Sequence, residues 1–444
     1  MSAARAGWNR RVWRLAGPII VSNVTVPLLG AVDTAVVGHL PDVAYLGAVA
    51  VGALVFSFLY SGLGFLRMGT TGLTAQALGA DDADELRAGL VRALALAAAL
   101  AGLLLLSRTP VIALALTLID AGDAVETQAR AYYAIRILSA PAALGNFVVL
   151  GWFLGLQNAR AGLYLQLLIN GLNIVLDLVF VVGLGMAVEG VALATVIAEY
   201  AGLAAGLVMI RAALGRLDGR LRWGRVLDGP RIRHAFGVNR DIFLRTLSLV
   251  LGFAYFTAAS ARLGDVVLAA NAVLMNLVTF MAYGLDGFAF AAEALVGRAV
   301  GAGDRPAFAA VVRATTLWAG LTAVAFTLAY LAAGPALVAL MTNIAAVRAA
   351  AGAVIAWPIL APLVAVWSYQ LDGIFLGATR TREMRNAMIV SLLLYLALAE
   401  AVATPWGNHG LWFAFMVFMI ARATTLMLYY PRLARAVGMA GRAG

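Results

Sequence analysis

The chain has 444 residues, of which 63% are apolar and only 12% are charged, and its mean hydropathy is +0.92. The net charge of +10 comes from Arg alone, because the sequence contains no Lys. This composition excludes an ordinary soluble domain and predicts a polytopic helical membrane protein. Cys is absent, which excludes disulfides, thiol catalysis and thiolate metal sites. His39, His234 and His409 show no metal-ligand spacing, so we expect no metal and no bound cofactor.

Twelve apolar segments follow one another along the chain, each long enough to cross a bilayer, which takes roughly 20 residues. They cover 12–38, 43–66, 86–106, 130–155, 161–184, 188–210, 236–261, 266–296, 309–332, 350–377, 386–404 and 410–430. The predicted fold class is therefore an all-α membrane protein with twelve transmembrane helices.

The distribution of Arg orients these helices. Alternate connections carry Arg, and the longest connection, from Arg211 to Arg245, holds nine of them. The positive-inside rule then places both termini and this loop in the cytoplasm, as in a bacterial inner-membrane protein. We expect the basic loop to contact anionic membrane lipids and not nucleic acid. It divides the chain into an N-terminal lobe, 1–210, a linker, 211–235, and a C-terminal lobe, 236–444.

The two predicted lobes are related in sequence. The run GHLPDVAYLGAVAVGALVFSFLYSGLGF, from Gly38, aligns without a gap on ARLGDVVLAANAVLMNLVTFMAYGLDGF, from Ala261. Further on, AQALGADD, from Ala75, matches GRAVGAGD, from Gly297. With six helices in each lobe, both repeats enter the membrane from the same side, an arrangement found in secondary transporters. The sequence thus predicts two pseudo-symmetric six-helix bundles.

Two acids, Asp33 and Asp177, stand inside the first and fifth apolar segments. A carboxylate at this depth costs several kcal/mol, so it normally faces a cavity or a partner and marks an ion or substrate path. Burial favours the protonated form of a carboxyl group, which suits a proton carrier. Both acids lie at similar depth in the outer half of the bilayer, and together they could share one proton. The alternative is that each makes only a local polar contact.

Polar residues near these acids form a candidate supporting network. Asn170, Asn173 and Asp177 share one stripe of the fifth segment, and a polar stripe faces partners rather than lipid. Thr195 and Tyr132 are further candidates for this network and the substrate cavity. The asparagines could instead join helices by hydrogen bonds alone.

Two prolines, Pro18 and Pro27, interrupt the helix that carries Asp33 and predict a bend there, either mobile or static. Four other intramembrane charges are weaker candidates, because each could pair or reach the membrane interface. They are Asp372, Glu293, Glu400 and Arg67.

Several catalytic and energy-coupling motifs are missing. The sequence has no GxxxxGK[ST] loop, no serine elbow and no HExxH, so we expect neither ATP-driven transport nor an enzyme.

The motifs VDTAVVGHL, LRMGTTGLTAQALG, NxxNIxLD, NRDIFLRT, AAEALVG and LDGIFLGATRT occur in this order. Together they resemble the multidrug and toxic compound extrusion (MATE) family, in its DinF branch, over essentially the whole chain. The resemblance implies two six-helix lobes in a V around a central cavity, and export of amphipathic or cationic compounds driven by inward proton or sodium flow. It also implies that Asp33 responds to protons and that Asp177, Asn173 and Thr195 complete the network.

The sequence therefore predicts a proton-coupled antiporter that works by alternating access, with small amphipathic or cationic substrates, membrane lipids around it and a monomeric state. A sodium-coupled exporter of the same fold is an alternative, but the seventh segment lacks the acid that other branches of the family use. A second alternative is a flippase for a lipid-linked precursor. A flippase that handles pyrophosphate should place Arg or Lys in mid-helix facing the cavity, whereas this chain offers acids instead, which suit cations.

Overall fold

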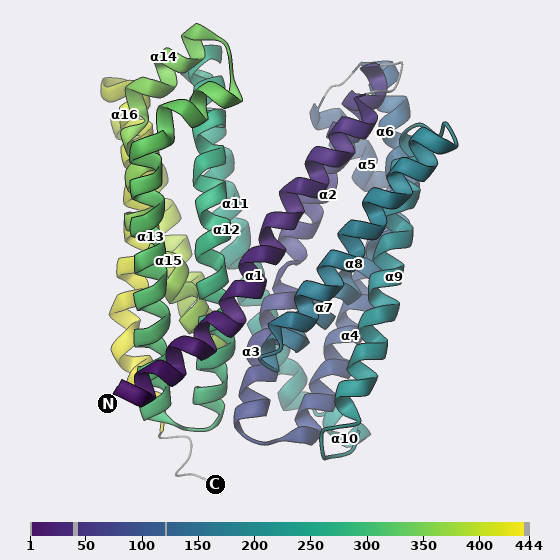
Figure 1. The fold of residues 1–444 in the computed structure, drawn as a ribbon, viewed down its shortest axis with the longest axis vertical. Coiled ribbons are helices and arrows are strands. Elements are labelled where there is room, and N and C mark those ends of the chain that lie inside the picture. Colours follow the sequence, from purple (N-terminus) through teal and green to yellow (C-terminus); the bar gives the residue numbers. More distant parts are fainter. Residues whose placement is uncertain (1, 39–42, 120–121, 439–444) are drawn as a thin grey trace. The chain divides into compact units, whose positions relative to one another are not determined.

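The structure, a computed structural model, describes residues 2–38, 43–119 and 122–438. A few side chains within these ranges, including those of Asp33 and Pro27, lie outside the described set. In the described ranges all regular secondary structure is helical (Figure 1). The chain forms two compact units, which we call the N-terminal unit (residues 21–235) and the C-terminal unit (residues 1–20 and 236–444).

In its described residues, the N-terminal unit contains the second part of the first helix, α1 (Ser2–Val37), followed by nine further α-helices and two short helices of other types. They are α2 (Val43–Leu63), α3 (Phe65–Gly79), α4 (Ala83–Leu106), α5 (Arg108–Ile119), α6 (Asp123–Arg136), the 3-10 helix η1 (Ile137–Ser139), α7 (Ala140–Gly155), α8 (Ala159–Asp177), the π-helix η2 (Leu178–Gly183), α9 (Val188–Leu214) and α10 (Trp223–Val226).

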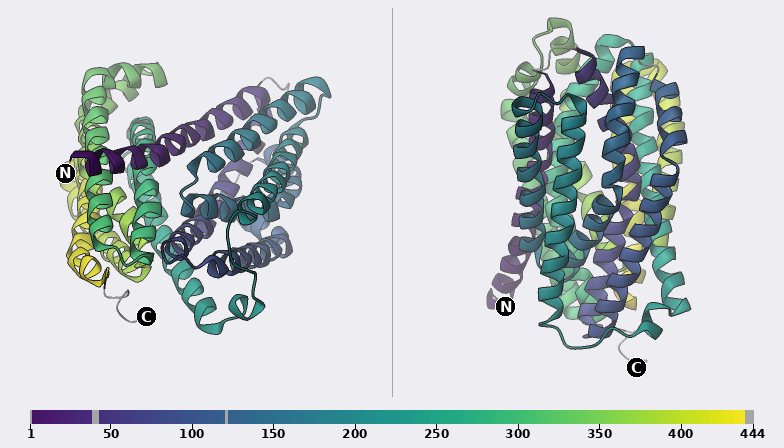
Figure 2. Two further views of the ribbon diagram at one scale, coloured as in Figure 1. Left: turned by 60° about the horizontal axis from the view of Figure 1, so that its bottom comes forward. Right: turned by 90° about the vertical axis from the view of Figure 1, so that its right-hand side faces the viewer.

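In the described residues the C-terminal unit consists of the start of α1, α11 from residue 236 onward, and the five helices that follow. The bounds are α11 (Gly229–Arg262), α12 (Asp265–Gly301), α13 (Arg305–Met341), α14 (Ala345–Val354), α15 (Ala356–Gly377) and α16 (Thr381–Ala436). Within this unit α12, α13, α15 and α16 pack side by side (Figure 2). Helix α16 joins two predicted segments at Gly407, whose φ of +54° breaks the regular helix.

Residues 1–20, expected in the N-terminal lobe, belong to the C-terminal unit. The reason is aromatic packing near the start of α1. The Trp13 ring meets Phe288 and Trp318 edge to face, with centroids 5.3 and 5.2 Å away. Trp318 Nε1 also donates a hydrogen bond to Asn9 Oδ1 at 3.3 Å. Edge-to-face aromatic pairs of this kind typically contribute about 0.5–1.5 kcal/mol each.

Eleven helical spans in the described residues are long and apolar enough to cross a membrane. They match the eleven predicted segments from 43–66 to 410–430, and the first predicted segment falls on α1. The short helices α5 and α14 were not predicted, because neither is long enough to cross a bilayer. The predicted helix 130–155 is interrupted at η1, beside Pro141, which lacks the N–H needed to continue it.

The internal repeat is visible in the backbone. Asp81 and Gly303 are equivalent in the alignment of AQALGADD with GRAVGAGD, and both have left-handed φ values, of 53° and 63°. The same offset relates Gln157 to Thr379, with φ values of 60° and 51°. Positive φ is uncommon for residues other than Gly, so these paired turns show that the two halves share one chain path.

The tightest helix contacts repeat in the same way. In the N-terminal unit a Cβ on Gly151 would lie 2.4 Å from the carbonyl oxygen of Arg67. At the equivalent position of the C-terminal unit, a Cβ on Gly373 would lie 2.2 Å from the carbonyl oxygen of Ala289. Glycine is required at both positions because only a missing side chain lets the backbones of α3 and α7, and of α12 and α15, approach so closely.

Candidate functional site

Asp177 occupies an unusual place in the N-terminal unit. It is the last residue of α8, and the π-helix η2 begins at the next residue. Its side chain is 0% exposed. The sequence predicted one continuous helix over 161–184, so the change of helix type at this acid is a correction. Short π-helical turns often occur at functional sites, since they displace side chains that a regular helix would align.

Asn173 lies one turn before Asp177 and joins it to α9. In one orientation of the amide, Asn173 Nδ2 donates to Thr195 Oγ1 at 3.1 Å. In the other, which satisfies more groups, Nδ2 donates to Asp177 Oδ2 at 3.0 Å and Oδ1 accepts from the backbone N–H and Oγ1 of Thr195. The orientation of an amide follows from its partners, so the second arrangement is the better one. The structure therefore brings together three of the predicted residues.

Asn170 connects the same face of α8 to α1. Its Nδ2 donates to Thr25 Oγ1 at 2.9 Å, and its Oδ1 accepts from Gln166 Nε2 at 2.9 Å. The polar stripe of α8 thus begins at Gln166 and ends at Asp177. Gln166 and Thr25 were missed in the sequence, although Gln166 follows the same helical spacing as the asparagines.

Asp33 belongs to α1, but its side chain lies outside the described residues, as does that of Pro27. The other predicted bend residue, Pro18, is half-buried in a helix that runs from Ser2 to Val37. The predicted bend of this helix stays a prediction.

Tyr132 is buried on α6 and accepts a hydrogen bond from Arg136, one turn later. The guanidinium of Arg136 also lies over the ring of Phe56, 4.7 Å from its centroid. Contact with an aromatic face helps to stabilise a cation away from water.

A further acid in this unit, Glu199, was missed in the sequence. It lies inside the apolar span of α9, and Asn146 Nδ2 donates to its Oε2 at 2.6 Å. Arg136 lies close enough to interact electrostatically with it. The argument that singled out Asp33 applies equally to an acid within VIAEYAGL, so the signal was present in the sequence.

The C-terminal unit holds a buried ion triad centred on Asp372. Its Oδ2 accepts from Arg245, and from Arg422 Nη2 at 2.9 Å. Arg422 is only 2% exposed and belongs to a predicted apolar segment. From the sequence we expected acids and no mid-helix Arg, and the buried Arg422 corrects that expectation. Removing one partner of such a buried cluster leaves an uncompensated charge, so Asp372 has an evident structural role.

The remaining weak candidates fall in different surroundings. Glu293 is fully buried on α12. Glu400 is exposed, accepts from Tyr255 at 2.7 Å and pairs with Arg262 at 3.0 Å. Arg67 is half-buried on α3, where its carbonyl oxygen faces Gly151.

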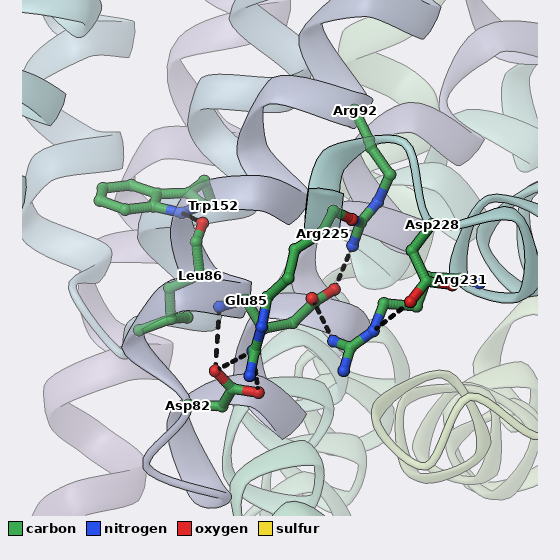
Figure 3. A network of polar contacts seen from close by, with 8 residues as sticks. All are labelled: Asp82, Glu85, Leu86, Arg92, Trp152, Arg225, Asp228 and Arg231. Carbon is green, nitrogen blue, oxygen red and sulfur yellow. Dashed lines mark hydrogen bonds and ion pairs between the residues drawn. The ribbon is translucent and has the colours of Figure 1, made fainter. Parts of the chain in front are cut away.

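The basic linker is anchored to the start of α4 by ion pairs (Figure 3). Asp82, the N-cap residue of α4, accepts from Arg225 Nη1 at 2.6 Å. Glu85, on the first turn, pairs with both Arg92 and Arg231. Arg92 also donates to the carbonyl oxygen of Arg225 at 2.6 Å. The linker is therefore an ordered part of the N-terminal unit.

The electrostatics of this anchor favour an ionised Asp82. Partial burial opposes ionisation, but hydrogen bonds from Arg225 and from the backbone N–H of Glu85 outweigh it and hold the pKa of Asp82 below its usual range. The same hydrogen bond raises the pKa of Arg225.

Among the residues described, no group of three or more His, Asp or Glu side chains could hold a metal ion. The site consists of the buried Asp177, joined through the amide of Asn173 to the hydroxyl of Thr195, and of the half-buried Glu199, which accepts from the amide of Asn146.

Repeated helical halves with acids buried in their spans define a polytopic membrane protein built like a secondary transporter. Comparison with known families gives a specific answer: the MatE family model matches residues 18–179 and 242–399. The chain belongs to the MatE family, which confirms the resemblance seen in its motifs.

Individual relatives agree with this assignment. The chain is 48% identical to the DNA damage-inducible protein F of Escherichia coli over 428 residues, covering 96% of this chain and 92% of that protein. It is 30% identical to the probable multidrug resistance protein NorM of Caulobacter vibrioides, covering 66% of this chain and 62% of that protein. Its fold is similar to that of a solved structure described as "Outward-facing conformation of a multidrug resistance MATE family transporter of the MOP superfamily", with a TM-score of 0.86, 18% identity, and coverage of 97% of this chain and 96% of that one.

Proposed function

We propose that the protein is a proton-coupled antiporter that exports small amphipathic or cationic compounds by alternating access. The observation that carries this proposal is the fully buried Asp177, joined through Asn173 to Thr195 within apolar spans. Keeping a buried carboxyl group ionised inside a membrane span costs several kcal/mol, and a proton neutralises it reversibly. Family membership and the similarity to proteins named as multidrug resistance proteins support the substrate class.

The pairing of Asp177 with Asp33 is supported by helix geometry. Thr25 on α1 contacts Asn170 on α8, and by the expected topology both helices run from the cytoplasm outward. Asp33 lies eight residues beyond Thr25, and Asp177 lies seven beyond Asn170. At 1.5 Å per residue the two acids lie about 12 and 10 Å beyond that contact, and so at nearly the same depth.

The proposed cycle uses this acid pair as a charge switch. In the outward-open state a proton binds at the Asp33–Asp177 network, removes negative charge and weakens the attraction for a cationic substrate. Substrate then leaves to the outside. In the inward-open state the proton leaves and a new substrate binds. The protein supplies the binding groups and the conformational change, and no catalytic chemistry is involved.

Transport by purified protein in proteoliposomes tests this proposal. A pH gradient imposed without sodium should drive substrate uptake or release, and Asp33→Asn or Asp177→Asn should reduce the rate at least tenfold with the fold retained. Asp265→Asn, at an exposed acid, is the matched control. Transport that requires a sodium gradient and ignores pH would favour the sodium-coupled alternative. Transport of a lipid-linked precursor alone would favour the flippase.

We also propose that the protein works as a monomer in the bacterial inner membrane, with both termini and the linker in the cytoplasm. The absence of Cys makes accessibility mapping direct. A cysteine introduced as Arg225→Cys should react with a membrane-impermeant maleimide only after the membrane is opened. Labelling in intact cells would contradict this topology.

A further inference from the structure

A groove of about 540 Å³ lies within the C-terminal unit, between α13, α15 and α16. Helix α13 lines it with Arg313, Leu317 and Leu321, which share one helix face. Helix α15 contributes Trp367 in the same way. Among the described residues that line the groove, Arg313 is the only charged one, so a single cation lies beside a mostly apolar groove.

The guanidinium of Arg313 is available to a ligand. The side chain is exposed, and its Nε donates to the carbonyl oxygen of Ala309 at 3.1 Å. Among the described residues, no carboxylate forms an ion pair with it. Tyr430 is close enough to interact with it electrostatically, so a cation and an aromatic ring stand at one end of the groove.

Gln370 adds a buried polar group to the wall of the groove. The residue is 3% exposed and lines the groove. Its Nε2 donates to Thr315 Oγ1 at 2.5 Å, and Thr315 donates in turn to the carbonyl oxygen of Val311 at 2.9 Å. This chain fixes the amide orientation and leaves Gln370 Oε1 without a hydrogen-bond partner among the described residues. This oxygen is itself enclosed by the protein, so Gln370 makes this part of the groove more polar but offers no acceptor that a ligand in the groove reaches.

The depth of these groups fits a lipid. Helix α13 has 37 residues, about 55 Å, which exceeds the roughly 30 Å hydrocarbon core. Arg313 lies eight residues after the helix begins, about 12 Å along it, and Gln370 lies seven residues before α15 ends. Both polar groups are therefore near one membrane interface. Leu321 lies two helical turns beyond Arg313, toward the membrane core.

We propose that this groove binds one phospholipid with an anionic headgroup, of the phosphatidylglycerol type. The phosphate binds Arg313, and an acyl chain lies along Leu317, Leu321 and Trp367. On the topology proposed above, the lipid comes from the cytoplasmic leaflet. Basic pockets between helices on this side of a membrane are suited to anionic headgroups.

Native mass spectrometry of the full chain, released from detergent with equal amounts of phosphatidylglycerol and phosphatidylethanolamine, tests the proposal. Wild-type protein should retain phosphatidylglycerol preferentially. Arg313→Gln should weaken this binding roughly fivefold, the effect of one basic residue near a membrane surface. Gly320→Leu should abolish it by filling the groove, because nothing lies within 4 Å of a Cβ at this lining position.

Two matched variants serve as controls. Arg432→Gln removes an exposed charge from α16 that does not line the groove, and Gly102→Leu adds the same side chain at another open helical position. Neither should change lipid retention. The proposal is overturned if both lipids bind equally to wild type, if Gly320→Leu leaves retention unchanged, or if Arg432→Gln matches Arg313→Gln. Displacement of the lipid by millimolar glycerol phosphate would show that the groove is a site for soluble phosphates instead.

Discussion

Asn173 Nδ2 lies 3.0 Å from Asp177 Oδ2, in the amide orientation that also joins Thr195. This contact gives a fully buried carboxyl group a neutral hydrogen-bond donor. A hydrogen bond to a charged group is worth about 1.5–3 kcal/mol, so the amide stabilises the ionised state without supplying a charge that cancels it. A donor of this kind leaves the acid able to exchange a proton, which a tight ion pair would suppress.

Asn173→Ala should therefore impair coupling. We expect a loss of about tenfold in proton-driven transport, since the variant removes a hydrogen bond to the acid while leaving the helix intact. Transport in proteoliposomes at several pH values measures the effect. Asn276→Ala is a suitable control because Asn276 is exposed and donates to the carbonyl oxygen of Ala272 on its own helix. Equal rates for the two variants would argue against a coupling role for Asn173.

Asp372→Ala should destabilise the protein by about 3–5 kcal/mol, because Arg245 and Arg422 would remain buried without their shared counter-charge. Thermal unfolding in detergent measures this loss, with Asp265→Ala as the exposed control. A triple replacement of the triad by apolar residues should recover much of the stability. If Asp372→Ala proves as stable as wild type but inactive, Asp372 belongs to the transport site instead.

The repeated glycine contacts give a paired prediction. Gly151→Ala and Gly373→Ala each place a Cβ within 2.4 Å of a backbone carbonyl oxygen, so the helices must separate. We expect each to cost about 1–3 kcal/mol, typical of overpacking. Gly102→Ala and Gly320→Ala, where a Cβ meets nothing within 4 Å, should not destabilise. The four unfolding temperatures, measured together, check this; similar values for all four would contradict the close approach.

The linker anchor should depend on pH. The pKa of Asp82 is lowered in the folded state, so its contribution is present above the unfolded pKa of about 4 and is lost as pH falls through the lower folded value. A spin label attached through Gly224→Cys, an open position on α10, should be immobile at pH 7 and become mobile near pH 3. Adding Arg225→Gln should make it mobile already at pH 7, whereas Asp218→Asn, at an exposed acid, should not. A label whose mobility ignores both pH and Arg225 would contradict the anchor.

Much of this protein could be predicted from its sequence. Composition required a membrane protein, hydropathy located the spans, and the match between AQALGADD and GRAVGAGD predicted two equivalent halves. Asp177, Asn173 and Asn170 could be grouped because helical spacing alone puts them on one face. These features follow from the preference of each side chain for water or lipid and from the local periodicity of the sequence.

Other features were decided only by the tertiary structure. The Arg245–Asp372–Arg422 triad joins three helices that are distant in sequence, so no local sequence pattern predicts it. The π-helical turn after Asp177 arises in a run whose composition is that of an ordinary apolar helix. Residues 1–20 belong to the C-terminal unit because Trp13 packs against aromatic residues of α12 and α13. Which residues come into contact in this way depends on which helix surfaces pack together in the folded chain. The spacing of residues in the sequence does not specify that packing.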